Sequence, residues 1–313
     1  MNSGKEKCME TFKLLDGREI PAVGFGCYNA KGGDNYQIIS DAIKAGYRFF
    51  DTASLYETER DLGQAIKDSG IPREEFFIQT KMWIDEMGYD ETKAAIERSL
   101  SRLQMDYVDV YLMHWPRSLP EYAGAPGHPE VIYKDPEYTP NPDWKKVQAE
   151  TCRALDELMD EGKIRGIGLS NFLPHHIMNV EKCLKHKPVV DQLELHLGYT
   201  QATAVDFAKS RGIVVQAWSP LGRSDVFEEP FFKVMADKYN VSVAQLGLRF
   251  LHQMGILPLP KASTMERQKQ NMDIFNFEIS EEDYYLIACM VPTCWQREHP
   301  DFVVPAKACS REQ

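Results

Sequence analysis

The sequence predicts an eight-stranded α/β barrel, the (β/α)8 or TIM barrel, in which parallel strands alternate with helices. Eight short apolar runs alternate with segments whose apolar residues recur at three- and four-residue spacing. Three of the runs end on a residue that can carry chemistry, namely Asp51, Lys81 and His114. The carboxyl ends of the strands form the active-site face of such a barrel, so this placement predicts one reaction centre.

The predicted strands are short and rich in β-branched and aromatic residues. They lie at residues 21–26, 47–52, 76–81, 108–115, 164–171, 189–195, 213–219 and 255–261. Between them, the helical spacing of apolar residues is clearest at 90–104, 150–163 and 242–255. Strands that alternate with helices in this way are typical of a sheet of parallel strands covered by helices.

The segment before the first strand predicts a β-hairpin, because TFKLLDGREIPAV places an Asp-Gly turn between two alternating runs. A doubly wound open sheet is the competing fold. It is disfavoured because the first strand-to-helix junction, GFGCYNAKGGDNY, lacks a G-x-G-x-x-G that opens a helix.

Length and composition limit the possible classes of protein. The 313 residues fit one barrel domain with insertions, and the net charge of −11 disfavours nucleic-acid and membrane-surface binding. No apolar run has the roughly 18 residues of a membrane helix, and the charged N-terminal segment is unlike a signal peptide. Seven scattered cysteines without a C-x-x-C pair predict reduced thiols in the cytoplasm, and neither a disulfide framework nor a zinc site.

Two segments depart from the alternation of strands and helices. Residues 117–144 are rich in proline and tyrosine and lack a helical period, and the tail 293–313 is also irregular. Long loops in compact domains often serve as lids or binding loops. We therefore expect both segments to lie near the reaction centre, since the first follows directly after His114.

The residues at the strand ends can build a proton donor. A tyrosine hydroxyl titrates near ~10, so it gives up its proton at neutral pH only when a nearby cation stabilises the phenolate. Lys81 can supply that cation for Tyr56, and Asp51 can hold Lys81 charged and oriented. Each residue also has an ordinary structural interpretation: a buried ion pair, a helix-start aromatic or a hydrogen-bonded His114. Their joint placement favours catalysis.

The chain resembles the aldo-keto reductase superfamily from the hairpin to about Phe277. The motifs that carry the resemblance are GFGCY, FFDTASLYETERDLGQAI, TKMW, DYVDVYLMHWP, GKIRGIGLSNF, QLELH, AWSPLG and PKASTMERQKQN. The resemblance implies an NADP-dependent carbonyl reductase whose barrel binds NADPH without a Rossmann domain. It places Asp51, Tyr56, Lys81 and His114 in the catalytic tetrad, with no metal.

The same resemblance assigns cofactor-binding residues. Those at the nicotinamide end are Cys27, Tyr28, Asp51, Ser170, Asn171, Gln192 and Trp218. Those that bind the pyrophosphate and adenosine are Ser219, Leu221, Lys261, Ser263, Arg267, Gln270 and Asn271. Three departures from the usual family pattern are Cys27, where many relatives have a threonine, Cys152, where tryptophan is frequent, and Ala262, where relatives often have a serine.

The chemistry of these side chains agrees with the assignment. Two amides and a hydroxyl at Asn171, Gln192 and Ser170 supply both the donors and the acceptors that a carboxamide needs, and the indole of Trp218 offers a face for the nicotinamide ring. Lys261 and Arg267 can clamp a 2′-phosphate, which favours NADPH over NADH.

The resemblance further implies an apolar substrate pocket lined by Tyr28, Trp83, His114 and Trp115. The substrate is a small carbonyl or alcohol compound of unidentified class, and the expected assembly is a monomer or a weak homo-oligomer. Two alternatives stay open: a barrel that binds NADPH as a regulatory subunit with little turnover, and a Schiff-base aldolase with Lys81 as nucleophile.

Overall fold

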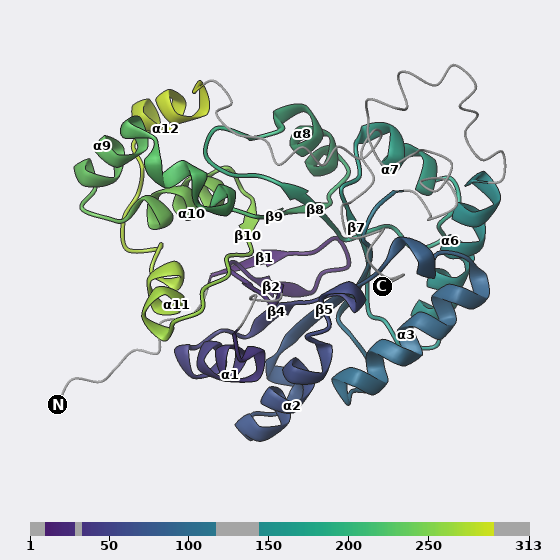
Figure 1. Cartoon of the computed structure of the whole chain (residues 1–313). Coiled ribbons are helices and arrows are strands. Elements are labelled where there is room, and N and C mark those ends of the chain that lie inside the picture. The colour runs from purple at the N-terminus through teal and green to yellow at the C-terminus, as the bar shows by residue number, and fades with distance from the viewer. Residues whose placement is uncertain (1–9, 29–32, 117–143, 291–313) are drawn as a thin grey trace, which may run out of the picture.

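A computed structural model of the chain describes residues 10–28, 33–116 and 144–290, and it confirms the predicted barrel (Figure 1). Eight parallel strands form one sheet in the order β10-β9-β8-β7-β6-β5-β4-β3. They are β3 (Phe25–Gly26), β4 (Phe49–Asp51), β5 (Phe77–Met82), β6 (Val110–Met113), β7 (Ile167–Ser170), β8 (Val190–Glu194), β9 (Val214–Trp218) and β10 (Leu257–Pro258). Seven of the strands fall inside predicted runs and are shorter than those runs, whereas β5 begins one residue after the start of its predicted run, 76–81, and ends one residue beyond it.

Backbone hydrogen bonds between the first and last strands close the sheet. The amide of Gly24 donates to the carbonyl of Pro258 at 3.1 Å, and that of Gly26 donates to Pro260 at 3.1 Å. A Cβ atom at Gly24 would collide with the rings and methyl groups of Phe49 and Leu259. Glycine is therefore required there, because any side chain would push the two strands apart.

The predicted hairpin is also confirmed, as β1 (Thr11–Lys13) paired antiparallel with β2 (Glu19–Pro21). Gly17 in its turn has a φ of 89°, which favours glycine. Leu14 and Ile20 of this hairpin pack in one cluster with barrel residues such as Phe49 and Phe77. Because those residues begin their strands, the hairpin covers the amino end of the barrel interior and leaves chemistry to the carboxyl end.

Helices surround the strands as an outer ring (Figure 1). They are α1 (Asn35–Ala45), α2 (Glu59–Ser69), α3 (Tyr89–Leu103), α6 (Trp144–Asp160), α7 (Pro174–Val180), α8 (Ala202–Ser210), α9 (Pro230–Lys238), α10 (Val243–Gln253), α11 (Met265–Met272) and α12 (Glu281–Ala288). The three clearest predicted helices correspond to α3, α6 and α10. Their apolar faces pack against the outward-facing strand residues in the largest core cluster.

Two expectations fall outside these helices and strands. The loop predicted at 117–144 lies, apart from its last residue, outside the described residues, and the tail predicted at 293–313 lies wholly outside them. Within the described ranges, none of the helices combines the length and the apolarity that a membrane span requires.

Candidate active site

The four residues predicted to form the reaction centre come together at the carboxyl ends of neighbouring strands. Asp51 is the last residue of β4, Lys81 lies near the end of β5, and His114 directly follows β6. Tyr56 ends the short helix η1 (Ser54–Tyr56), which begins three residues after β4. Because β4, β5 and β6 are adjacent parallel strands, residues that are far apart in the sequence lie close together at their carboxyl ends.

Lys81 is the centre of the cluster and is fully buried. Its Nζ donates to Asp51 Oδ2 at 2.8 Å, to the carbonyl of Thr52 at 2.9 Å and to the hydroxyl of Tyr56 at 3.3 Å. Burial lowers the pKa of Lys81, while the charge of Asp51 and its hydrogen bond oppose that shift. All three N–H bonds of the ammonium group therefore have an acceptor, one of which is the phenol oxygen.

His114 stands on the other side of Tyr56. Its Nε2 lies 3.5 Å from the Tyr56 hydroxyl, and its ring packs edge-on against Trp83 with centroids 4.9 Å apart. Burial, followed by the charge of Lys81, lowers the pKa of His114 well below its usual range. The imidazole is therefore neutral at physiological pH, and in one tautomer its Nε2–H can donate to an oxygen.

Beneath the cluster, three glutamines form a hydrogen-bonded layer across the barrel. Gln79 and Gln192 donate to Asp51 Oδ1 at 2.6 and 3.0 Å, and the same two amides donate to Gln216 Oε1 at 2.8 and 3.1 Å. The Asp51 carboxylate thus accepts from two amides as well as from Lys81, and these contacts hold its orientation.

The predictions included Gln192 but missed Gln79 and Gln216. Strand alternation carried the signal, because Gln79 precedes Lys81 by two residues and Gln216 precedes Trp218 by two. Residues two apart on a strand point to the same face, here into the barrel.

Asn171, Ser170 and Trp218 form a second polar group beside His114. The Trp218 indole N–H donates to Asn171 Oδ1 at 2.9 Å, and Asn171 Nδ2 donates to the His114 carbonyl at 3.0 Å and to Ser170 Oγ at 3.2 Å. Asn171 has a φ of 64°, in the left-handed region that asparagine tolerates better than most residues. This backbone turn directs the amide of Asn171 toward His114 and the indole.

The segment after β9 turns sharply at Ser219, whose φ is 47°. Ser219 and Leu221 are half-buried, and Leu221 packs against the main core directly before the short helix η4 (Gly222–Glu228). The predicted pyrophosphate segment therefore lies at the same end of the barrel as Trp218.

The predicted adenosine-end residues lie in the segment before α11 and along the helix itself. Lys261 is half-buried, and Ser263, Arg267 and Gln270 are exposed; Asn271 is buried. Thr264 caps the helix by accepting from the Arg267 amide at 3.4 Å. Burial lowers the pKa of Lys261, opposed by Cys27.

Lys261 and Arg267 have no carboxylate partner within the described ranges. Neither side chain forms an ion pair there, although the chain carries a net charge of −11. Two cations beside a helix N-terminus are suited to bind a phosphate group.

The predicted substrate residues differ in exposure. Tyr28 is 45% exposed, and its ring meets that of Tyr56 edge-on at 5.0 Å. Trp83 and Trp115 are each 3% exposed and pack together with Ile84. The two indoles thus form a rigid apolar wall beside His114.

Cys27 is buried, and its thiol lies 3.8 Å from the carbonyl of Phe25. Burial, followed by the negative charge of Asp51, raises the pKa of Cys27 far above its usual range. The thiol therefore stays protonated, and Cys27 is a packed residue and not a nucleophile.

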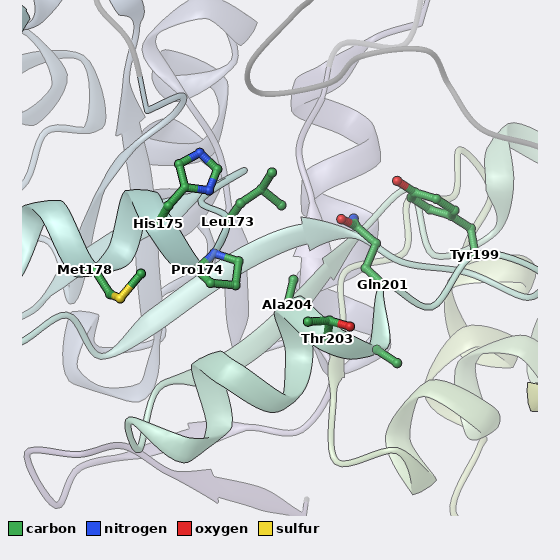
Figure 2. Close-up of a pocket in the computed structure, with 9 residues that line it drawn as sticks. Leu173, Pro174, His175, Met178, Tyr199, Gln201, Thr203 and Ala204 are labelled. Carbon is green, nitrogen blue, oxygen red and sulfur yellow. The ribbon is translucent and has the colours of Figure 1, made fainter.

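A separate groove of about 540 Å³ lies between the amino ends of α7 and α8 (Figure 2). None of the residues predicted for the reaction centre lines it. Leu173 and Met178 contribute from α7 and its start, and Tyr199 and Gln201 from the loop before α8.

Comparison with known proteins identifies the family. A model described as the Aldo/keto reductase family matches residues 22–289. The chain belongs to this family. The resemblance drawn from the motifs is thereby confirmed, as is the prediction of an oxidoreductase of this type.

Individual relatives of this aldo/keto reductase agree over most of their length. Glyoxal reductase of Bacillus subtilis is 41% identical over 275 residues, which cover 88% of this chain and 90% of that protein. Glycerol 2-dehydrogenase (NADP(+)) of Saccharomyces cerevisiae is 38% identical over 294 residues, with 88% of each chain covered. A solved aldo-keto reductase of Bombyx mori in complex with NADP has a TM-score of 0.76 at 33% identity, over 89% of this chain and 92% of that one. The prediction of an NADP-dependent enzyme is confirmed.

Proposed function

We propose that this aldo/keto reductase reduces an aldehyde or ketone to an alcohol with NADPH, and that Tyr56 donates the proton. The observation that carries the proposal is the Lys81 ammonium, which lies 3.3 Å from the Tyr56 hydroxyl and 2.8 Å from Asp51. A buried cation this close to a phenol oxygen stabilises the phenolate that proton transfer leaves behind. Asp51 and the glutamine layer keep that cation charged and in place.

The chain's own residues fit the cofactor. Trp218 is half-buried and held by its hydrogen bond to Asn171, so its indole face can support a planar ring. Ser170, Asn171 and Gln192 would bind the carboxamide of that ring: Asn171 bonds to Trp218, and Ser170 Oγ donates to the Gln192 carbonyl at 3.1 Å. When bound, NADPH supplies a hydride from its nicotinamide ring.

At the other end of the site, Lys261 and Arg267 would hold the 2′-phosphate, with Ser263, Gln270 and Asn271 near the adenosine. Ser219 and Leu221 would hold the pyrophosphate through the turn after β9. These two cations, which form no ion pair with the residues that the structure describes, would distinguish NADPH from NADH, because only NADPH carries the additional phosphate.

His114 is proposed to orient the carbonyl. Its imidazole is neutral, so its Nε2–H can donate to the substrate oxygen without competing with Tyr56 as an acid. Reduction of the carbonyl would place negative charge on that oxygen, where the Tyr56 hydroxyl and the His114 imidazole can stabilise it. The Tyr56 hydroxyl then transfers its proton to the oxygen, and Lys81 stabilises the resulting phenolate.

The aromatic residues define where the rest of the substrate lies. The ring of Tyr28 packs edge-on against Tyr56, and that of Trp83 packs edge-on against His114. Trp115 packs in the same apolar cluster as Trp83. Two relatives are named for activity on glyoxal and glycerol. We therefore propose small carbonyl compounds, and dicarbonyls first, as the substrates to test. A cytoplasmic location is proposed from the thiols, because Cys27, Cys152, Cys183 and Cys289 are all free.

Tyr56→Phe tests the assignment of the acid. The variant should still bind NADPH, but its kcat for a dicarbonyl should fall by ~10²-fold or more, the scale of general acid catalysis. Tyr36→Phe is the matched control, because Tyr36 is a surface tyrosine of α1 bonded to Asp68. Unchanged turnover in Tyr56→Phe would exclude Tyr56 as the proton donor.

The alternatives give different results in the same assays. A Schiff-base aldolase needs a free amine at Lys81, whereas all three of its N–H bonds have acceptors. Borohydride treatment with a carbonyl substrate should therefore leave the mass of the protein unchanged. A regulatory barrel would bind NADPH but consume none with any carbonyl compound offered.

A further inference from the structure

The short helix that ends at the proposed acid is bonded to a buried carboxylate. Helix η1 spans Ser54, Leu55 and Tyr56, and its backbone bond runs from the Tyr56 amide to the Ala53 carbonyl at 3.0 Å. A 3₁₀ helix of this length has little stability of its own. The position of Tyr56 therefore depends on contacts between η1 and other segments. Ser54 makes such a contact, because its hydroxyl donates to Glu86 Oε2 at 2.6 Å.

The same carboxylate also holds the aromatic wall of the site. Glu86 ends the short helix η3 (Ile84–Glu86), which follows β5 after one residue, and its side chain is buried. Its Oε2 accepts from the backbone amide of Trp83 at 2.8 Å as well as from Ser54. One oxygen atom therefore joins the segment that carries Tyr56 to the segment that carries Trp83.

Helix α3 fixes this carboxylate from the outer ring. Arg98 Nη2 pairs with Glu86 Oε1 at 3.1 Å, and the Thr92 hydroxyl donates to the Glu86 carbonyl at 3.1 Å. Apolar packing acts in the same direction, since Leu55 of η1 packs against the cluster that contains Trp83. Glu86 thus has bonds at both carboxylate oxygens and at its backbone, and these bonds restrict its orientation.

We propose that Glu86 is a positioning residue for carbonyl reduction, which places the Tyr56 hydroxyl through Ser54 and the Trp83 ring through its backbone amide. The proposal rests on the proposed function, because the placement matters to turnover only if Tyr56 donates the proton. The Tyr56 hydroxyl lies 3.3 Å from Lys81 Nζ, near the limit of a hydrogen bond, so a small shift of η1 would break that contact. A displacement of ~1 Å at a reacting group can lower a rate by ~10²-fold.

Two variants test the two connections separately. Ser54→Ala removes the bond to η1 and keeps the bond to Trp83, so its kcat for a dicarbonyl should fall by ~10-fold or more while its KM stays within about twofold. Glu86→Gln loses the charge that its donors share, so it should lower kcat by a similar factor and also raise KM. The Kd for NADPH should stay within about twofold in both variants, because most of the predicted cofactor residues lie from β7 onward.

The double variant shows whether Glu86 acts through Ser54. Both single changes remove the same bond between η1 and the carboxylate. The loss of kcat in Ser54→Ala combined with Glu86→Gln should therefore be smaller than the product of the two separate losses.

Asp109→Asn is the matched control for lost stability. Asp109 is also a buried carboxylate, and its Oδ2 accepts from Arg73 at 2.8 Å and from the backbone amide of Ile78 at 2.9 Å. It directly precedes β6 and so lies at the amino end of the barrel, away from the reaction centre. Its replacement should lower the unfolding temperature as Glu86→Gln does, but it should leave kcat and KM unchanged.

An NMR spectrum reads the Trp83 contact without turnover or cofactor. The chain has five tryptophans, so labelling with ¹⁵N-tryptophan gives five backbone amide signals, and the loss of one signal in Trp83→Phe assigns it. The Trp83 amide proton should move upfield in Glu86→Gln, because its acceptor is no longer charged. It should not move in Asp109→Asn.

Four results would overturn the proposal. They are an unchanged kcat in Ser54→Ala, losses that multiply in the double variant, an unchanged Trp83 amide signal in Glu86→Gln, and the same changes of kcat and KM in Asp109→Asn. Failure of the proposed function looks different, because Tyr56→Phe would then keep its turnover. If only the positioning role is wrong, Tyr56→Phe is impaired and Ser54→Ala is not.

Discussion

Asp191 offers a test of buried charge next to the active site. It lies on β8 beside Gln192, but its side chain points to the opposite face, and its strand neighbours are the buried residues Leu169 and Val215. Both carboxyl oxygens are buried and have no partner of full hydrogen-bond geometry within the described residues. Burial raises the pKa of Asp191 well above its usual range, and a backbone hydrogen bond from Phe172 only partly opposes this.

Because the pKa of Asp191 is raised, the free energy of unfolding falls as the pH rises. An acid whose pKa is higher in the folded state than in the unfolded state binds its proton more tightly when folded. Its contribution to stability is therefore fully present below the unfolded pKa, and it is lost as the pH rises toward the folded pKa. Starting from an unfolded value of 3.8, the loss is about 1.4 kcal/mol per pH unit and reaches about 4 kcal/mol at pH 7 for a carboxyl that stays neutral.

Asp191→Asn removes this titration while keeping the shape of the side chain. We expect the variant to be more stable than the original protein at pH 7, by up to about 4 kcal/mol less the cost of burying an amide, which is about 1 to 3 kcal/mol. The gain should grow with pH between 5 and 7. Urea unfolding at half-unit pH intervals measures it, with the m-value as a check that both proteins unfold alike.

A difference between the two proteins that stays constant over this pH range would refute the reasoning. It would mean that Asp191 has the same protonation in the folded and unfolded states, and that its burial is compensated. A variant that is less stable at every pH, with an unchanged slope, would point instead to a hydrogen bond that only the carboxylate can accept.

Two further predictions concern the cofactor and the helix layer. Lys261→Ala combined with Arg267→Ala should raise the Kd for NADPH by two decades or more and leave the Kd for NADH nearly unchanged, since charge-assisted bonds contribute ~1.5 to 3 kcal/mol each. Fluorescence titration measures both Kd values. An equal loss of affinity for the two cofactors would show that the pair does not recognise the 2′-phosphate. Gly63→Ala should destabilise the protein by about 3 kcal/mol or more, because its Cβ would overlap the backbone carbonyl of Leu103 where α2 crosses α3. Gly17→Ala, which meets no neighbouring atom, should cost only about 1 kcal/mol for its positive φ; equal losses in the two glycine variants, measured by urea unfolding, would contradict the packing argument.

The strand positions were predictable because each strand is a short apolar run whose outward residues must contact helices. The ends of those runs also identified Asp51, Lys81 and His114, since a parallel barrel brings all strand ends to one face. Strand limits were less accurate. The predicted runs include the residues that lead into and out of each strand, such as those on either side of the two-residue β10, which are apolar but make few ladder bonds.

Contacts between inward residues on different strands were not predictable from the runs alone. Gln79 and Gln216 each look like an isolated polar residue in an apolar run, and only the register of β5, β8 and β9 around the closed barrel brings their amides to Gln192 and Asp51.

The sequence by itself determined the alternation of strands and helices, the hairpin, and which residue types arrive at the carboxyl face. These features depend on periodicity and chain direction, which are local properties. Only the tertiary structure decided the distances within the site, the neutral state of His114, the burial of Lys81 among three acceptors and the raised pKa of Asp191. Those properties depend on desolvation and on neighbours from other strands. Both arise only when the strands close into a barrel and exclude water from the groups between them.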